Sequence, residues 1–414
     1  MNAIGRRAAL DVNDIRRAFP ILAQIVRGKP FIFLDSAASA QKPRVVIDTM
    51  REVMETQYAN VHRGIYWMSE RTSEAYETVR DEVASLIGAP SREEIVFTRN
   101  STEAINLVAH SFGRSYLRSG DAVLISEMEH HANIVPWQML RDERGIELRV
   151  ARITDAGELD MESLEALLSD RRVKLVAITH MSNVLGSYTP AARIAAMAHA
   201  YGARVLFDGS QAAVHRSVDV QSIDADFYVF TGHKLYGPTG VGVLWARREL
   251  LEEMPPFLGG GDMISSVSFE RSTWADIPHK FEAGTPAIVE VIGLGAAIRF
   301  VNGIGFDAIA AHEAVLTDRA LVRLSGVPGV RVLGSAQDRG GVVSFVVDRA
   351  HAHDVATLLD RAGIAVRAGQ HCAEPLIRRL GLESTVRASF GVYTTLNEVD
   401  ELARAVERVR EFFV

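Results

Sequence analysis

Lys234 is the lysine whose surroundings best suit covalent chemistry. It is one of five lysines in 414 residues, and it lies in the segment TGHKLYGPTGVG, directly after an apolar run. A lysine removed from water can lose its proton and attack a carbonyl carbon, whereas an arginine keeps its charge. The small and polar residues around Lys234 therefore predict an amine that forms a covalent bond with a carbonyl compound.

Polar side chains follow five short apolar runs, at the point where each run ends. In a parallel α/β sheet, ligands bind beyond the carboxyl ends of the strands. Five such ends on one edge of a sheet predict a ligand site. The runs and the residues that follow them are Ile95–Thr98 with Arg99, Asn100, Ser101 and Thr102; Val123–Ser126 with Glu129, His130 and His131; Leu175–Thr179 with His180 and Asn183; Val205–Phe207 with Asp208 and Gln211; and Phe227–Phe230 with Thr231, Gly232, His233 and Lys234.

Taken one at a time, these polar residues allow more than one interpretation. Ser101 and Thr102 precede a predicted helix and would serve as a helix cap or as a cradle for a phosphate group. Asp208 would cap a turn or take part in catalysis. His130 and His131 are adjacent, so their side chains point apart, and no spacing of neighbouring ligands completes a zinc set. We therefore predict no metal site.

Taken together, the same residues indicate one cofactor. An amine, a carboxylate, an imidazole and a helix start suited to phosphate occur at one predicted sheet edge. Pyridoxal 5′-phosphate (PLP) bonds covalently to a lysine and needs an acidic partner for its pyridinium nitrogen. The combination therefore predicts a PLP site built around Lys234 and Asp208.

Cys372 is the single cysteine of the chain, so no intramolecular disulfide can form. A lone cysteine is either a small buried hydrophobe or a reactive thiol. Cys372 lies between His371 and Glu374 in a polar loop that contains Gly369, which favours the reactive thiol. Only the thiolate is nucleophilic, and we expect His371 and Arg367 to favour that form. A free thiol fits a reducing compartment, so we expect the protein to be cytoplasmic.

The pattern of apolar residues predicts an α/β fold with two domains. β-rich runs alternate with amphipathic stretches through the first two thirds of the chain, which is typical of a mostly parallel sheet covered on both faces. After about residue 298, longer helices bracket short strands, which indicates a smaller α+β domain that the N-terminal segment would complete. The further segments are a strand at Val241–Trp245, helices at Glu103–Leu117, Pro190–Tyr201, Phe306–Leu324, His353–Ala362 and Asn397–Phe413, and strands at Val342–Val347 and Ile364–Arg367.

Composition excludes several classes of partner. Hydrophobic residues make up 48% and charged residues 23% of the chain, as in ordinary globular proteins. A net charge of −7 argues against a nucleic-acid-binding surface and favours small-molecule ligands. No apolar run approaches the roughly 18 residues that a membrane span needs. The first twenty residues lack the apolar core of a secretory signal, so we expect no membrane association.

The chain resembles the SufS-type, or group II, cysteine desulfurases. These belong to the class-V aminotransferase family, which has the PLP-dependent fold type I. The resemblance implies a large domain at 22–297 with a mostly parallel seven-stranded sheet, and a small α+β domain at 1–21 and 298–414 that carries the cysteine loop. The matching blocks are LDSAASAQKP (34 to 43), NVHRG (60 to 64), TEAINLVA (102 to 109), MEHHANIVPWQ (128 to 138), ITHMSNVLG (178 to 186), TGHKLYGPTG (231 to 240), FEAGTP (281 to 286), VRAGQHCAEPL (366 to 376) and VRAS (386 to 389).

The resemblance assigns ten residues to the cofactor. Lys234 would form the covalent bond and later move the Cα proton of the substrate. Asp208 would keep the pyridine nitrogen protonated, and His130 would stack on the ring as a catalytic residue. Thr285 would reach the phosphate from a second subunit, so the protein would be a homodimer. The ten residues are Ser101, Thr102, His130, Asn183, Asp208, Gln211, Thr231, His233, Lys234 and Thr285.

The resemblance also implies the substrate and the fate of its sulfur. Arg387 would bind the carboxylate of L-cysteine, beside Asn183, and Arg367 and His62 would lie at the mouth of the site. Cys372 would take the sulfur as a persulfide, releasing L-alanine. A SufE- or SufU-like acceptor would then receive the sulfur for iron–sulfur cluster assembly.

Two alternatives accompany this interpretation. The first keeps the cofactor and changes the substrate, giving a selenocysteine lyase or a cysteine sulfinate desulfinase. The second is a non-catalytic scaffold for sulfur assembly, against which the presence of both Lys234 and Asp208 argues. The chain departs from the pattern of the family at five positions, which are Tyr66, Ser101, Thr231, Gln370 and Thr394.

Overall fold

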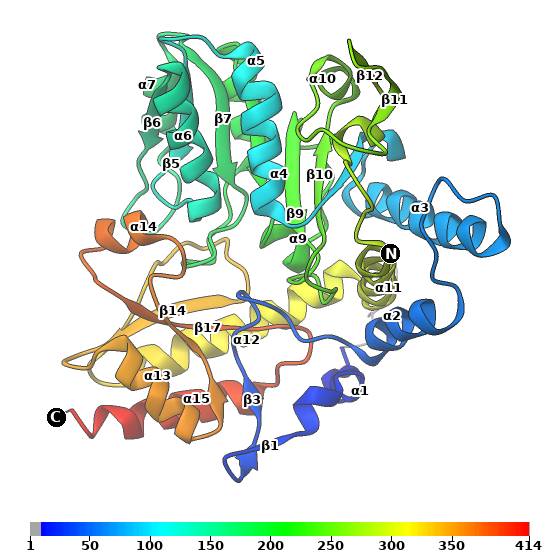
Figure 1. The fold of residues 1–414 in the computed structure, drawn as a ribbon. Coiled ribbons are helices and arrows are strands. Elements are labelled where there is room, and N and C mark those ends of the chain that lie inside the picture. Colours follow the sequence, from blue (N-terminus) through cyan, green and yellow to red (C-terminus); the bar gives the residue numbers. More distant parts are fainter. Residues whose placement is uncertain (1–9, 414) are drawn as a thin grey trace, which may run out of the picture.

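A seven-stranded sheet forms the centre of the larger part of the molecule (Figure 1). The computed structural model describes residues 10–413, so the expectations for residues 1–9 lie outside the described residues. The strand order is β4-β10-β9-β8-β7-β5-β6, and β10 is antiparallel to both of its neighbours. The predicted mostly parallel sheet is confirmed. Its strands are β4 (Ile95–Thr98), β5 (Ala122–Ser126), β6 (Glu147–Ala151), β7 (Val173–Thr179), β8 (Arg204–Asp208), β9 (Phe227–Thr231) and β10 (Gly242–Ala246).

Helices cover both faces of this sheet, as the apolar runs require. Successive strand residues point to opposite faces, so Ile95 and Phe97 pack in one apolar cluster and Val96 in another. The cluster of Ile95 includes helices α3 (Trp67–Ile87), α7 (Met161–Leu168), α8 (Ala191–Ala200) and α11 (Ile288–Ile304). The cluster of Val96 includes helices α4 (Ser101–Val108), α6 (Val135–Arg144) and α10 (Arg248–Glu253).

A four-stranded antiparallel sheet forms the smaller part, below the first sheet in Figure 1. Helices pack against it around an apolar cluster of its own. The strand order is β13-β14-β17-β16. The strands are β13 (Val330–Val332), β14 (Val342–Val347), β16 (Arg367–Gly369) and β17 (Thr385–Ser389), and the helices are α12 (Phe306–Ser325), α13 (Ala352–Arg361) and α15 (Leu396–Arg410). Helix α14 (Glu374–Arg379) instead buries Leu376 and Ile377 in the apolar cluster of the large sheet.

The N-terminal segment contributes to this smaller part. Strand β3 (Ile32–Phe33) pairs in parallel with β15 (Ile364–Ala365), and Leu34 lies in the apolar cluster of the small sheet. Arg16, in helix α1 (Val12–Arg17), forms an ion pair with Glu398 of α15. Residue 297 falls inside α11, whereas the chain bends by 76° between α11 and α12. We therefore propose domain boundaries near residues 35 and 305 in place of 21 and 297.

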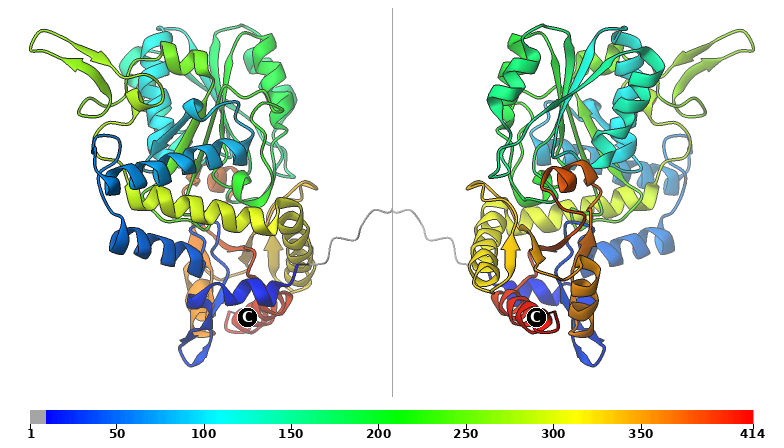
Figure 2. Two further views of the ribbon diagram at one scale, coloured as in Figure 1. Left: turned by 90° about the vertical axis from the view of Figure 1, so that its right-hand side faces the viewer. Right: turned by 90° about the vertical axis from the view of Figure 1, so that its left-hand side faces the viewer.

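The remaining elements lie outside the two main sheets. The hairpin of β11 and β12 projects from the body (Figure 2). No single helix within residues 10–413 is long and apolar enough to cross a membrane. Helices α11 and α12 meet both requirements only when they are taken together, and they form a bent pair. The remaining elements are β1 (Ile25–Val26), β2 (Lys29–Pro30), α2 (Arg44–Thr56), α5 (Arg114–Tyr116), α9 (Ala212–His215), β11 (Ile264–Val267) and β12 (Ser272–Trp274).

Candidate active site

A cavity of about 150 Å³ opens at the carboxyl edge of the large sheet, where the small domain faces it. Three of the predicted site residues, His62, Thr285 and Cys372, are not among those that line it. Eleven do line it: Ser101, Thr102, His130, Asn183, Asp208, Gln211, Thr231, His233, Lys234, Arg367 and Arg387.

Lys234 lies in this cavity on the turn after β9. Burial lowers the pKa of its amine, the Asp208 carboxylate opposes this shift, and the charges of Arg387 and Arg367 add to it, so that the pKa lies at about 8. An amine with this pKa is in part uncharged near neutral pH, and only an uncharged amine can attack a carbonyl carbon. The position therefore suits the covalent chemistry that the sequence predicts.

The pKa of Lys234 makes the uptake of a carbonyl cofactor depend on pH. Protein freed of cofactor should bind added PLP covalently at a rate that rises from pH 7 and levels off above about pH 8. The sign follows because acid converts the amine to an unreactive ammonium ion. Stopped-flow absorbance at a series of pH values measures the rate. A rate that still climbs steeply above pH 10 would show an ordinary lysine.

Asp208 ends β8 as a buried carboxylate. Its Oδ1 accepts hydrogen bonds from the backbone N of Ser210 at 3.0 Å and from Ser210 Oγ at 2.5 Å. Ser210 Oγ also lies 2.8 Å from Ser101 Oγ, which joins the carboxylate to the first residue of α4. These contacts fix the orientation of Asp208 toward the cavity that it lines.

Helix α4 begins at the wall of the cavity. Asn100 caps it, since its Oδ1 accepts from the backbone N of Glu103 at 2.9 Å. The first backbone N–H groups of a helix have no partner within the helix, and its dipole favours an anion there. Thr231 Oγ1, on the same wall, is buried and has no hydrogen-bond partner among the described residues. Together, the helix start and Thr231 suit a phosphate group.

His130 is a neutral imidazole. Its Nδ1 accepts from the backbone N of Ala132 at 3.0 Å, which leaves the ring proton on Nε2. Burial lowers the pKa of His130 to about 4, and the nearby charge of Lys234 acts in the same direction. An uncharged aromatic ring in the cavity is suited to lie against a planar ligand.

His131 fixes the cysteine loop to the large domain. Its backbone N donates to the carbonyl oxygen of Cys372 at 2.7 Å, and its Nε2 accepts from the backbone N of Glu374 at 3.0 Å. His131 therefore has a structural role, because it holds the cysteine loop. No local pattern indicates this role, because the partners lie about 240 residues away along the chain.

The cysteine loop has an unusual backbone. His371 and Cys372 both have left-handed φ angles, of 54° and 56°, and Gly369 has a φ of 124°. Such a conformation costs about 1–3 kcal/mol for a residue with a side chain, and the surrounding contacts must hold it. Asn183 supplies one of them, since its Nδ2 donates to the carbonyl oxygen of His371 at 2.7 Å.

Arg367 is the cation beside the thiol. Its Nη2 lies 3.6 Å from Cys372 Sγ, and it also lines the cavity. The expectation that His371 supplies positive charge is wrong. Burial lowers the pKa of His371 to about 3, with Arg387 and Arg367 adding to the effect, and its Nε2 contacts Thr385 Oγ1 at 2.7 Å. Arg367 is therefore the positively charged group that contacts the thiol of Cys372.

Arg387 lies in the middle of β17 and is almost completely buried. Its Nη1 donates to the carbonyl oxygen of Asn183 at 2.9 Å, and its Nη2 donates to Asp35 Oδ1 at 3.1 Å. Its Nε is buried and has no partner among the described residues. A guanidinium group with N–H groups still to pair can bind the carboxylate of a ligand. Nothing in the sequence identified Asp35 as the residue that fixes Arg387.

Gln211 and His233 complete the wall of the cavity. Gln211 Nε2 donates to the carbonyl oxygen of Ala37 at 2.9 Å. Burial lowers the pKa of His233 to about 4, with Lys234 and Lys42 adding to the effect, so the ring is neutral. Lys42 Nζ donates to the carbonyl oxygen of His233 at 2.9 Å, which holds the turn that carries Lys234.

Two of the predicted residues, His62 and Thr285, lie away from this cavity. His62 Nε2 contacts Glu77 Oε1 at 2.9 Å on helix α3. Thr285 lines a second cavity, which adjoins the first because Asn100 and His233 line both. The described chain therefore does not bring His62 or Thr285 into its own cavity.

The departure at Thr394 is explained by its contacts. Thr394 Oγ1 accepts from the backbone N of Gly391 at 3.1 Å, and Thr395 caps α15 in a reciprocal pair with Glu398. The segment therefore closes a turn and starts a helix, away from the reacting groups. Ser101 and Thr231 retain hydroxyls at the wall of the cavity. Tyr66 is exposed, and nothing in the structure explains the Tyr66 and Gln370 departures.

Comparison with known proteins assigns the family. Residues 32–402 match the family Aminotransferase class-V. A protein named cysteine desulfurase from Dickeya dadantii is 54% identical over 399 residues, 96% of each chain. The crystal structure of the cysteine desulfurase CsdA from Escherichia coli is 40% identical, with a TM-score of 0.90 over 98% of this chain and 100% of that one. A cysteine desulfurase structure from Thermococcus onnurineus is 37% identical, with a TM-score of 0.92 over 98% and 99%.

The fold and the cavity therefore define a PLP-dependent enzyme of fold type I, and the chain belongs to the class-V aminotransferase family. Within that family it belongs to the cysteine desulfurases. The residues of the cavity fit PLP. Lys234 offers a reactive amine and Asp208 a fixed carboxylate, and Thr231 offers a buried hydroxyl, beside the start of α4, that has no partner within residues 10–413.

Proposed function

We propose that this protein desulfurates L-cysteine to L-alanine and carries the sulfur on Cys372. The observation that carries the proposal is the position of Arg367, which lines the cavity of Lys234 and also contacts Cys372 Sγ at 3.6 Å. Arg367 thus lines the same cavity as the amine that would hold the cofactor, and it also contacts the thiol that would take the sulfur. The identity to proteins named cysteine desulfurases supports the same activity.

Each residue of the cavity has a part in this reaction. PLP, when bound, withdraws electrons from the substrate Cα so that its proton can leave. Asp208 would keep the pyridine nitrogen protonated, and the Lys234 amine would accept the Cα proton and return it. Arg387 would hold the substrate carboxylate with its remaining N–H groups. Cys372 Sγ, as a thiolate, would attack the substrate sulfur.

The sulfur step balances without a further reactant. The bond between Cβ and sulfur breaks as the bond between Cys372 Sγ and that sulfur forms. The electron pair of the broken bond goes to the carbon side, which takes up protons and leaves as alanine. The enzyme is left with a persulfide on Cys372. An acceptor thiol on a SufE- or SufU-like protein would empty it, and the sulfur would serve iron–sulfur cluster assembly.

Mass spectrometry tests this proposal directly. After incubation with L-cysteine and no acceptor, the peptide that contains Cys372 should be heavier by one sulfur atom, because the chain has no other cysteine. The added mass should disappear with a thiol reductant, and alanine formed before reduction should match the number of sites. Alanine formation with an unmodified Cys372 would contradict the proposal. A rate that no sulfur-accepting protein increases would contradict the transfer to an acceptor.

A homodimer is the assembly that fits this site. Thr285 and His62 lie outside the cavity of their own chain, so a second copy would have to supply them. Large apolar side chains are exposed at Ile65 and Trp67, next to His62, and at Phe269 on the β11–β12 hairpin. Arg63 forms an ion pair with Asp262 at 2.5 Å, which joins these two regions. An apolar surface of this kind is typical of an interface between subunits.

Sedimentation measures the dimer. At micromolar concentration the protein should sediment at about twice the 45.4 kDa of the chain. Replacing Trp67 by aspartate should shift the distribution toward monomer, because the charge would be buried in the interface. A fully active monomer would contradict the proposed homodimer.

The free thiol that the reaction requires fits a reducing compartment, so we propose a cytoplasmic location.

A further inference from the structure

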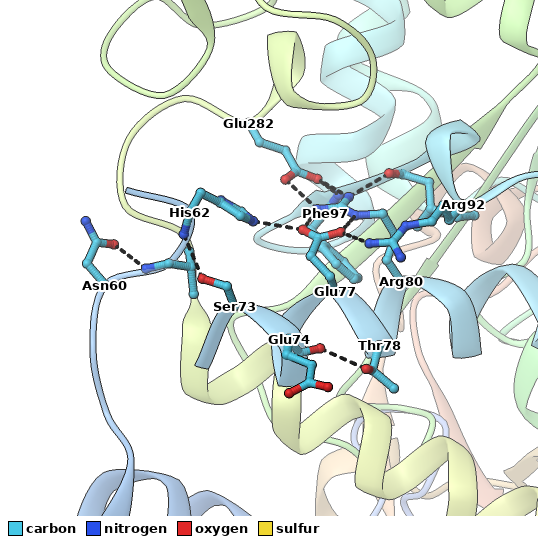
Figure 3. A network of polar contacts seen from close by, with 12 residues as sticks. Asn60, His62, Ser73, Glu74, Glu77, Thr78, Arg80, Arg92, Phe97 and Glu282 are labelled. Atoms are coloured by element: carbon cyan, nitrogen blue, oxygen red, sulfur yellow. Dashed lines mark hydrogen bonds and ion pairs between the residues drawn. The ribbon is translucent and has the colours of Figure 1, made fainter. Parts of the chain in front are cut away.

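A buried network of charges surrounds Arg80 of helix α3 (Figure 3). The Arg80 side chain is 1% exposed, and it lies between Glu77 on its own helix and Glu282 in the loop before α11. Its guanidinium carbon also lies 4.6 Å from the ring centre of Phe97. A buried charge persists only where its hydrogen-bonding groups are paired.

Each nitrogen of the guanidinium group is bonded. Two bonds reach Glu282, from Nη1 to Oε1 at 2.7 Å and from Nη2 to Oε2 at 3.0 Å. Two reach Glu77, from Nε at 3.0 Å and from Nη2 at 3.1 Å. The fifth runs from Nη1 to the carbonyl oxygen of Ile95 at 2.8 Å. Arginine has five N–H donors, so this side chain has none left for a ligand.

The network fixes the loop that carries Thr285. Glu282 Oε1 accepts from the backbone N of Phe97 at 2.7 Å as well as from Arg80. Phe97 lies in β4, which leads to the helix start at Ser101. Glu282 thus joins the loop to the strand beside the phosphate end of the cavity, and Thr285 follows three residues later.

The same network holds His62. Glu77 accepts from Arg92 and Arg80 and contacts His62 Nε2 at 2.9 Å. The backbone N of His62, which has a left-handed φ of 71°, donates to Ser73 Oγ at 2.8 Å. The two segments that lie outside the cavity of their own chain are therefore tied to one buried cation, Arg80.

We propose that Arg80 and Glu282 are positioning residues that set the Thr285 loop for the cofactor phosphate of a second subunit, with His62 held in the same unit through Glu77. This inference rests on the homodimer of the proposed function. The alternative interpretation of this cluster is a divalent-cation site. The candidate ligand atoms of His62, Glu77 and His279 lie within 4.8 Å of one another. Arg80 and Arg92 already neutralise Glu77, and their charges oppose a cation there.

Mixed dimers separate action across the interface from action within a subunit. Lys234→Ala marks a cavity that cannot bind PLP covalently, so only the other cavity is counted after borohydride reduction. In the first mixed dimer, one subunit carries Glu282→Gln and its partner Lys234→Ala. In the second, one subunit carries both changes and its partner neither. The measurement is the PLP concentration that half-saturates covalent attachment.

The two mixed dimers should differ in one direction. In the first, the intact cavity receives Thr285 from a subunit with an intact loop, and its PLP affinity should equal that of the wild type. In the second, the intact cavity receives the altered loop, and its affinity should fall about tenfold or more, the loss expected for a hydrogen bond to a charged group. The opposite pattern would mean that Glu282 acts within its own subunit, and equal affinities would mean that it does not act on the phosphate.

Thr285→Ala is tested in the same two mixed dimers, in place of Glu282→Gln. Its result distinguishes a failure of the positioning role of Glu282 from a failure of the shared phosphate site. If Thr285→Ala weakens only the second arrangement and Glu282→Gln weakens neither, the dimer stands and the positioning role is wrong. If Thr285→Ala shows no difference between arrangements, the shared phosphate site itself is wrong. Glu74→Gln is the matched control, because Glu74 pairs with Arg71 on the exposed side of the same helix. Should Glu282→Gln fail to fold, Glu282→Asp carries the same prediction.

Discussion

Replacing Lys234 by alanine is expected to lower the rate of alanine formation from L-cysteine at least roughly a thousandfold. The variant loses both the covalent bond to the cofactor and the base for the Cα proton, and proton transfer alone contributes about 10²–10⁴-fold. It should also lose the visible absorbance of covalently bound PLP. Alanine measured by chromatography and the absorbance spectrum of the purified protein give the two results.

Lys280→Ala is the control for this variant. Lys280 is also buried, but its Nζ donates to the carbonyl oxygen of Glu252 and it lines neither of the cavities near Lys234. This control should retain the absorbance and the activity. Lys234→Arg should behave like Lys234→Ala, because a guanidinium group keeps its proton. A Lys234→Ala protein with an unchanged spectrum would place the cofactor elsewhere.

The position of Lys234 could be predicted because its signals are local. An apolar strand, a turn of small residues and the amine follow one another in the sequence, and the rule that ligands bind at carboxyl ends of strands supplies the rest. The same rule predicted that Asp208 and Thr231 lie at this site, and both line the cavity. Strand β6 (Glu147–Ala151) was not among the runs read from the sequence, because it forms the edge of the sheet and carries charged residues among the apolar ones.

Contacts between distant segments could not be predicted in this way. The sequence suggested one strand at Ile364–Arg367, where the structure has β15 pairing with β3 and β16 pairing with β17. The hold of His131 on the cysteine loop and of Asp35 on Arg387 likewise joins residues far apart in the chain. Local pattern gives the type of each element, while such partners depend on the whole packing. The burial that makes His371 neutral also depends on the packing of the whole chain, so it could not be predicted from the local sequence.

Replacing Cys372 by alanine is expected to lower the desulfuration of L-cysteine at least roughly a thousandfold while leaving the cofactor in place. The variant removes the nucleophile for the substrate sulfur, whereas Lys234 and Asp208 remain. Its PLP absorbance should therefore match that of the wild type. Sulfide and alanine should be measured together, because their ratio reports how far sulfur is retained on the protein.

L-selenocysteine makes the Cys372→Ala prediction specific. Selenium leaves carbon more readily than sulfur, so turnover of L-selenocysteine should survive the loss of the thiol while turnover of L-cysteine does not. Arg367→Ala should give a milder form of the same result, because it removes the cation 3.6 Å from Sγ and leaves the sulfur atom. If Cys372→Ala releases sulfide from L-cysteine at an undiminished rate, the sulfur does not pass through Cys372, and the left-handed loop that presents it needs another explanation.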